Sequence, residues 1–113
     1  MQEKLGKIVR KKEAAISFEG QEICRNYFKT DKITFGLSVL KPGVIGDLDP
    51  GHEIADEVFF CTKGNVAVYF PEDQTYYELD AYDGLLIPPK TGHKLYNLGD
   101  EEAIVIWACA PHQ

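Results

Sequence analysis

The chain has 113 residues, a formal net charge of −6 at pH 7 and three cysteines, which is room for one domain, because single domains usually contain about 100–200 residues. Hydrophobic residues make up 44% of the chain and charged residues 27%, a composition that excludes intrinsic disorder and fibrous repeats. The longest uncharged apolar run, residues 103–110, is far shorter than the roughly 20 residues of a membrane-spanning helix. We therefore expect no membrane partner.

Basic and acidic residues are unevenly distributed along the chain. Residues 1–32 contain eight Lys and Arg residues and five acidic residues. Residues 33–113 contain four Lys and Arg residues and thirteen acidic residues. A protein that reads nucleic acid carries an extended basic patch, and the basic cluster here is only the short run 10–12. We expect no nucleic-acid partner. The charged N-terminal segment lacks the apolar core of a secretory signal, so we expect a cytoplasmic protein.

Short apolar runs, separated by turn residues at intervals of roughly 8–12 residues, predict strands in chain order. The first fifteen residues are compatible with a short helix or an edge strand. Strands are predicted at residues 33–40, 57–62, 65–70, 76–79, 85–87, 94–97 and 103–109. This pattern is typical of an all-β sandwich or barrel rather than of βαβ units. We divide the chain into an N-terminal strand or helix extension, residues 1–32, that packs on a barrel of residues 33–113.

Two segments contain residues that suit metal chemistry. Residues 47–57 hold five carboxylates and the imidazole of His52, a composition compatible with a solvated acidic loop or with a site for Fe, Mn, Ni or Zn. In residues 83–97 a proline pair ends one strand and His93 opens the next. Strand alternation places His93, Leu95 and Asn97 on one face, where the histidine is either a buried polar residue or a ligand.

Together these segments resemble the two motifs of the cupin superfamily, G-x5-H-x-H-x3/4-E-x6-G and G-x5-P-x-G-x2-H-x3-N. Glu57 and the glycine seven residues later match E-x6-G, and His52 stands where the second histidine of the pair belongs. His93 and Asn97 match H-x3-N after the prolines. The sequence departs from the pattern at the first histidine, because Pro50 stands there and offers no donor atom for a metal.

The resemblance implies an RmlC-like jelly-roll barrel, also called a double-stranded β-helix, of the small cupin 2-like kind. It also implies a divalent transition metal (Fe, Mn, Ni or Zn) inside the barrel, and a homodimer. It places His52, Glu57 and His93 at metal-ligand positions and assigns no catalytic residue.

The missing histidine calls for an additional ligand, for which Glu53, Asp49 and Asp47 are the candidates; an oxygen ligand favours harder cations such as Mn or Fe. Glu53 is also an alternative to His52, because Glu53 and Glu57 share a face on a regular strand. We prefer His52, which a β-bulge would turn inward.

The resemblance leaves the reaction open. We expect a metal-dependent enzyme of the dioxygenase, isomerase or lyase class acting on a small molecule. The alternatives are a cupin that binds or senses a small ligand, such as a sugar, without turnover, and a purely structural dimer. Lys90 and Lys94 flank His93 and are candidate anchors for an acidic substrate. The residues predicted to line the pocket, or else to pack in the core, are Phe59, Cys61, Tyr69, Tyr96 and Asn97.

Overall fold

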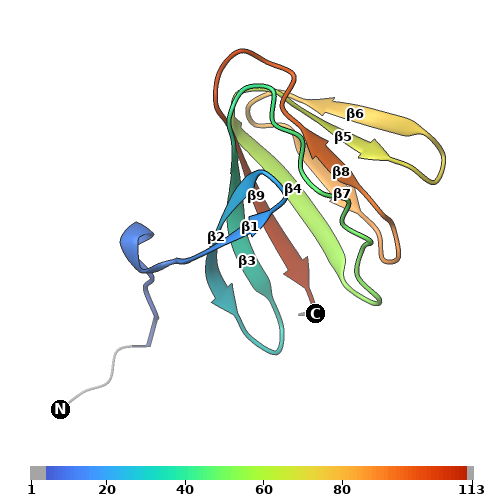
Figure 1. The fold of residues 1–113 in the computed structure, drawn as a ribbon. Helices are drawn as coiled ribbons and strands as arrows, with labels where there is room; N and C mark the ends of the chain where they lie inside the picture. Colours follow the sequence, from blue (N-terminus) through green and yellow to red (C-terminus); the bar gives the residue numbers. More distant parts are fainter. Residues whose placement is uncertain (1–4, 112–113) are drawn as a thin grey trace.

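The computed structural model describes residues 5–111, whose regular structure is almost entirely β (Figure 1). A 3-10 helix at Lys11–Glu13 precedes the strands. The strands are β1 Ala15–Glu19, β2 Glu22–Lys29, β3 Thr34–Leu40, β4 Asp56–Lys63, β5 Val66–Phe70, β6 Thr75–Leu79, β7 Gly84–Ile87, β8 Lys94–Tyr96 and β9 Ala103–Ala110. None of the helical segments among residues 5–111 has the length and apolar character needed to cross a membrane.

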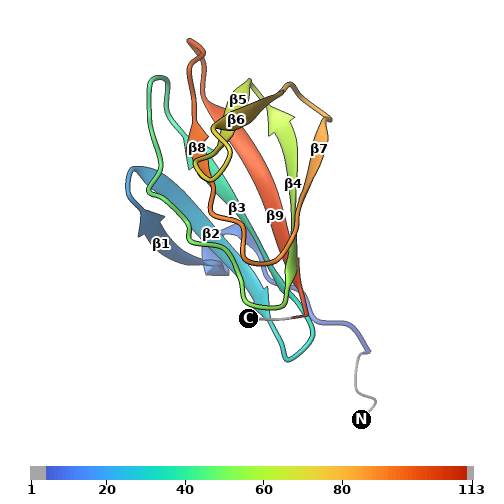
Figure 2. The same cartoon turned by 90° about the vertical axis from the view of Figure 1, so that its right-hand side faces the viewer.

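The strands form two antiparallel sheets that face each other (Figures 1 and 2). The larger sheet has the order β1-β2-β3-β9-β4-β7 and the smaller one the order β6-β5-β8. The chain runs from β4 of the larger sheet to β5 and β6 of the smaller one, back to β7, across again to β8 and back to β9, which is the winding of a jelly roll. The predicted double-stranded β-helix is therefore confirmed.

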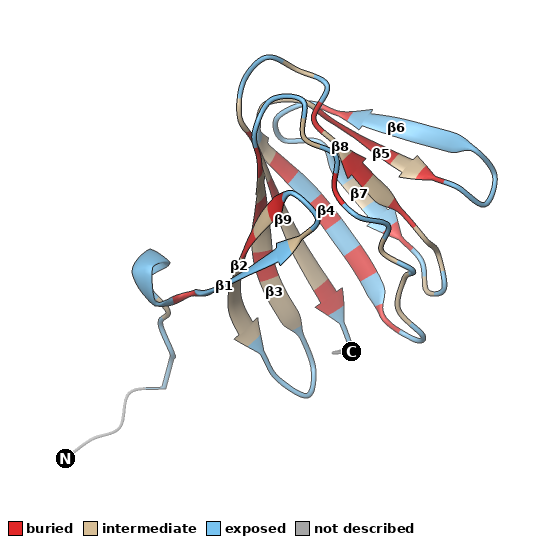
Figure 3. Ribbon diagram, viewed as in Figure 1, coloured by how far each residue is buried: buried red, intermediate tan, exposed pale blue. Residues whose placement is uncertain are grey.

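The core lies between the two sheets and follows the two-residue period of a strand. In β4, Glu57, Phe59 and Cys61 are buried and the residues between them are exposed, which gives the alternating bands of Figure 3. Leu40 and Val105 from the larger sheet and side chains from β5, β6 and β8 complete one apolar cluster. Strand β5 is buried at every position but Tyr69, so both of its faces are covered.

The N-terminal segment contributes two strands to the larger sheet. Strand β2 pairs with β3 from Ile23↔Val39 to Lys29↔Thr34, and β1 pairs with β2 at the edge of the sheet. Residues 11–13 form the 3-10 helix and the first strand begins at Ala15, while residues 1–4 lie outside the described part of the chain. The segment predicted as an extension thus continues the barrel wall.

The loop between β3 and β4 is held against the start of β8 by backbone hydrogen bonds. Asp49 and His93 exchange two of them, each with an N···O distance of 2.9 Å, and the Gly46 N–H donates to the carbonyl of Leu95 at 2.8 Å. Asn97 is fully buried, and its side-chain amide donates to the carbonyls of Leu40 at 3.0 Å and Glu101 at 2.9 Å. The loop that carries the acidic residues is therefore fixed beside the strand that carries His93.

Candidate metal centre

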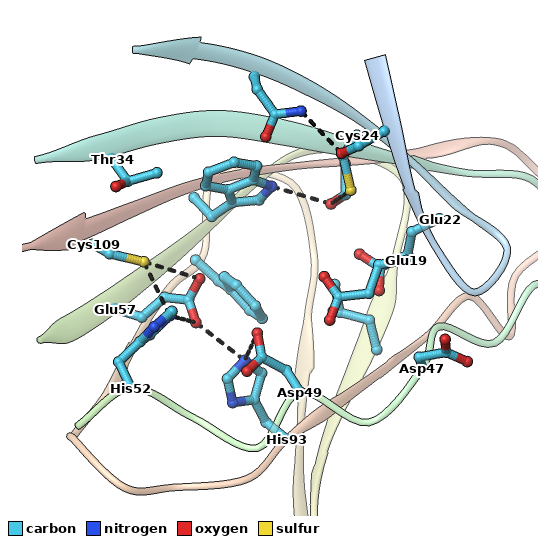
Figure 4. Close-up of a pocket in the computed structure, with 16 residues that line it drawn as sticks. Glu19, Glu22, Cys24, Thr34, Asp47, Asp49, His52, Glu57, His93 and Cys109 are labelled. Atoms are coloured by element: carbon cyan, nitrogen blue, oxygen red, sulfur yellow. Dashed lines mark hydrogen bonds and ion pairs between the residues drawn. The ribbon is translucent and has the colours of Figure 1, made fainter. Parts of the chain in front are cut away.

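A cavity of about 170 Å³ lies between the sheets, below the loop at residues 41–55. Figure 4 shows its polar side chains converging from both sheets and from the loop. The lining residues are Ser17, Glu19, Glu22, Cys24, Asn26, Thr34, Ser38, Asp47, Asp49, His52, Glu57, Phe59, His93, Leu95, Trp107 and Cys109.

Two buried side chains meet at the centre of this group. Glu57 on β4 is 5% exposed, His93 before β8 is 2% exposed, and the Glu57 Oε1 and His93 Nε2 atoms lie 3.1 Å apart. The Nδ1 of His93 lies 2.9 Å from the carbonyl oxygen of Thr91, and because a carbonyl only accepts, this nitrogen carries the hydrogen. In a neutral His93, the lone pair of Nε2 therefore points at a carboxylate oxygen.

Two acceptors in contact repel each other unless a proton or a cation lies between them. Neither Glu57 Oε1 nor His93 Nε2 has a hydrogen-bond partner within the described part of the chain, and both atoms are shielded from solvent. Burial acts to lower the pKa of His93, but the Glu57 carboxylate, the Thr91 carbonyl and the charge of Asp49 outweigh it and raise that pKa. The arrangement thus attracts positive charge to the space between Glu57 and His93.

Asp49 and His52 complete the group from the loop. Asp49 Oδ2 lies 3.6 Å from His93 Nε2, while its Oδ1 accepts a hydrogen bond from the Gly51 N–H at 2.9 Å. His52 Nε2 lies 3.5 Å from Glu57 Oε1. Gly51 has a φ of 91°, and a Cβ there would lie 2.6 Å from the Thr91 nitrogen, so only glycine permits this path of the loop.

Cys109 borders the same group from β9. Its Sγ lies 3.2 Å from His52 Nε2 and donates a hydrogen bond to Glu57 Oε2 at 3.4 Å. Burial first, and then the negative charge of Glu57, raise the pKa of this thiol to about 12. Cys109 is therefore a neutral thiol at pH 7 in the protein without a metal. Potential ligand atoms gather in two overlapping sets, His52–Glu57–Cys109 and Asp49–Glu57–His93, in each of which all atoms lie within 4.8 Å of one another.

Further carboxylates line the wall formed by β1 and β2. Glu22 is 5% exposed, and its burial, with the charges of Glu19 and Asp49, raises its pKa to about 7 against the hydrogen bond from Ser38. Burial also raises the pKa of Glu19, as do the charges of Asp49 and Glu57. The cavity is therefore strongly electronegative.

The structure brings two of the predicted ligands, His52 and His93, each next to the third, Glu57, but in separate sets of mutually close ligand atoms, His52 with Cys109 and His93 with Asp49. Among the candidate additional ligands, Asp49 lies beside His93, Asp47 lines the cavity nearer to solvent, and Glu53 is exposed outside the lining. The alternation argument for Glu53 fails because β4 begins only at Asp56, so residues 52–55 follow an irregular path. The expected bulge at His52 is likewise replaced by this loop.

Of the residues predicted to line the pocket, Phe59 does so, packing edge-on to the His93 ring at a centroid distance of 5.4 Å. The others lie elsewhere. Cys61 is buried in the apolar cluster, two residues beyond Phe59 on the same strand face, and Asn97 is occupied by backbone carbonyls. Tyr69 and Tyr96 pack against each other away from the cavity, because they occupy the opposite strand face from Val68 and Leu95.

Sequence reasoning missed Cys109, Glu19 and Glu22 as members of the site. Alternation in the last strand places Cys109 on the face of buried Val105, a signal that was available. No such signal was available in the sequence for Glu19 and Glu22, because the strands that carry them were not predicted.

A two-sheet jelly roll with histidines and carboxylates gathered between its sheets defines a β-barrel with a candidate metal centre. The sequence profile of the cupin domain family matches residues 36–109. The chain therefore belongs to the cupin domain family. No curated protein sequence matches it.

Solved structures of similar fold include TT1209 from Thermus thermophilus, at 22% identity and a TM-score of 0.74, covering 94% of this chain and 98% of that one. KdgF from Halomonas sp. matches at 18% identity and a TM-score of 0.78, covering 96% of each chain. A predicted oxalate decarboxylase from Thermotoga maritima matches at 15% identity and a TM-score of 0.76, covering 92% and 98%. At these identities the likeness concerns the fold alone.

Proposed function

We propose that this chain is a metal-dependent cupin that acts on a small molecule, with a divalent transition metal held by His52, Glu57 and His93 and by Asp49 in place of the missing histidine. The observation that carries the proposal is the contact between Glu57 Oε1 and His93 Nε2, two buried acceptors 3.1 Å apart. A bound cation removes their repulsion, whereas a barrel without a metal would have to hold a proton there.

The chain's own residues prepare this arrangement. Thr91 holds the hydrogen of His93 on Nδ1, which leaves Nε2 free to coordinate, a second-sphere role common around metal-bound histidines. Phe59 packs against the ring of His93 and limits its rotation. When bound, a metal would supply Lewis-acid or redox chemistry. The two oxygen and two nitrogen donors favour Fe or Mn over softer ions.

The reaction is proposed only at the level of a dioxygenase, isomerase or lyase. The names of KdgF and of the predicted oxalate decarboxylase belong to those proteins, and identities of 18% and 15% do not bring their substrates to this chain.

Since no disulfide joins any of the three cysteines, we place the protein in a reducing compartment, the cytoplasm.

Elemental analysis of protein purified without an affinity tag tests the metal site. We expect near-stoichiometric Fe, Mn, Ni or Zn in the parent and in a Glu53→Gln control, whose residue is exposed outside the cavity. We expect none in a folded His52→Ala, His93→Ala double variant. The proposal fails if the parent stays free of metal after reconstitution, or if the double variant retains it.

We also propose that two copies of the chain pair through the outer sheet face, the side chains of the larger sheet that point away from the core. These are Phe35, Leu37, Val39, Val58, Phe60, Leu86, Ile104, Ile106 and Ala108, neighbours by strand register. Several are exposed, including Val58 at 43% and Leu86 at 61%, and so large an apolar surface marks an interaction site. A second copy is the proposed occupant because the resemblance to cupins implies a homodimer, and none of these side chains is charged, so the repulsion between two acidic chains is least at this face.

A further inference from the structure

The charge of the cavity bears on the kind of molecule it can hold. Five carboxylates line it, and no Lys or Arg is among its described lining residues. Lys94, a candidate anchor for an acidic substrate, instead lies over the ring of Tyr96, 5.7 Å from its centroid, and Lys90 is exposed outside the lining. Arg10, Lys11, Lys12 and Arg25 border a separate depression near the N-terminus.

A bound metal does not reverse this charge. The proposed centre uses the carboxylates of Asp49 and Glu57, which a divalent cation neutralises. Glu19, Glu22 and Asp47 line the cavity beyond that centre, and Figure 4 shows Glu19 and Glu22 across the cavity from the Glu57–His93 pair. An anionic substrate would thus meet a negative wall, and a cation would find acceptors there.

The Glu57–His93 pair, whose facing atoms are 3.1 Å apart and are assigned to the proposed metal, marks one side of the cavity, and the rest of its space is left for an organic ligand. Glu57 Oε1 and His93 Nε2, both on side chains more than nine-tenths buried, lack hydrogen-bond partners within residues 5–111 and face this space. The indole of Trp107, on β9 of the larger sheet, also lines the cavity, and indole rings attract organic cations. A volume of about 170 Å³ is close to that of cavities that hold a benzene-sized molecule.

We infer that the cavity takes a small organic cation, a protonated amine of about five to eight non-hydrogen atoms, whose ammonium group is bound by Glu19, Glu22 and Asp47. This inference names the substrate class of the proposed metal-dependent function and rests on it. It also separates this chain from cupins that act on small dicarboxylates, whose substrates the cavity would repel.

Three probes with the same four-carbon chain test the inference: n-butylammonium, n-butanol and butyrate. Ligand-observed NMR titrations at low ionic strength measure their affinities for metal-loaded protein and for chelator-treated protein, with metal content determined on the same samples. We expect n-butylammonium to bind about tenfold more tightly than n-butanol, and butyrate to bind least tightly of the three. Added salt should weaken the binding of n-butylammonium. The same order is expected in both samples, because Glu19 and Asp47 are not among the proposed metal ligands.

Matched variants locate the binding. Glu19→Gln and Asp47→Asn each remove a carboxylate from the cavity. We expect each substitution to lower the affinity for n-butylammonium about fivefold. Glu101→Gln removes the same charge from an exposed position outside the lining and should change the affinity less than about twofold. Asp47 is itself exposed, so its variant should fold even if the Glu19 variant does not.

The inference is overturned if butyrate or n-butanol binds as tightly as the amine, if no probe binds, or if the Glu101 variant loses as much affinity as the cavity variants. A protein that binds the amine but takes up no metal would refute the proposed metal centre and leave the cation site standing. A protein that takes up metal but does not bind the amine would refute the cation site and leave the proposed metal centre standing.

Discussion

Glu22 offers a direct measure of how strongly the cavity wall disfavours negative charge. The carboxyl group is buried, and its pKa is raised from 4.5 to about 7. One pKa unit corresponds to about 1.4 kcal/mol, so the ionised group destabilises the folded state by about 3 kcal/mol. We expect Glu22→Gln to stabilise the protein by about this amount at pH 8, because the neutral amide has no charge to desolvate.

The pH dependence has a definite sign. Below pH 4.5 the carboxyl is protonated in both the folded and the unfolded state, so the parent and the Glu22→Gln variant should then have similar stability apart from small packing differences. As the pH rises from about 4.5 to 7, the unfolded chain releases the proton first, and the parent loses stability that the variant keeps. The stability difference should therefore grow through this window and level off above it.

Urea unfolding of chelator-treated protein between pH 4 and pH 8 measures this difference, with Glu78→Gln, at an exposed position on β6, as the control. Groups distant from Glu22 titrate alike in parent and variant, so the difference reports Glu22 together with the groups coupled to it, chiefly Glu19 and Asp49. A difference that stays constant with pH, or that is largest in acid, would refute the reasoning. So would an equal pH dependence in the control.

Three further changes test other parts of the fold. Asn97→Ala should lower the free energy of unfolding by about 3 kcal/mol, because it leaves buried carbonyls without donors; a loss below about 1 kcal/mol in urea unfolding would contradict this role. Gly36→Ala should destabilise by about 1–3 kcal/mol, since a Cβ there would overlap the ring of Trp107 and the backbone carbonyl oxygen of Arg25; an unchanged melting temperature in calorimetry would contradict this close packing. Val58→Glu on the outer sheet face should yield a monomer by light scattering, whereas Tyr76→Glu, exposed on the smaller sheet, should leave the dimer intact. Equal masses for these two variants would contradict the proposed pairing.

The sequence predicted every strand that contributes to the apolar core and missed β1 and β2, which line the cavity and contribute nothing to that core. Runs such as 33–40 and 103–109 alternate around an apolar interior and show their period directly. In β2 the inward positions are Glu22, Cys24 and Asn26, which line the cavity. A strand whose inner face is polar, and whose outer face is partly apolar, lacks the hydrophobic alternation on which prediction depends.

Within the candidate site, the sequence predicted only residues that lie in one of the two local motifs. His52, Glu57 and His93 stand at spacings that resemble a known pattern, and the fold brings them together. Cys109 reaches the site because β9 pairs with β4 in a register that sets Glu57 directly opposite it. Such a register is decided by the pairing of strands distant in sequence, which a local pattern does not contain.

The two backbone hydrogen bonds between Asp49 and His93 give this barrel an unusual freedom to evolve. They involve no side-chain atoms, so any residue with a backbone N–H at position 49 can preserve them. A change such as Asp49→His would give up the hydrogen bond from Gly51 to the carboxylate and the ion pair with His93, and in the proposed metal centre it would exchange an oxygen donor for a nitrogen donor. Selection could thereby retune the preference for one metal over another by a single substitution, without rebuilding the loop that presents it.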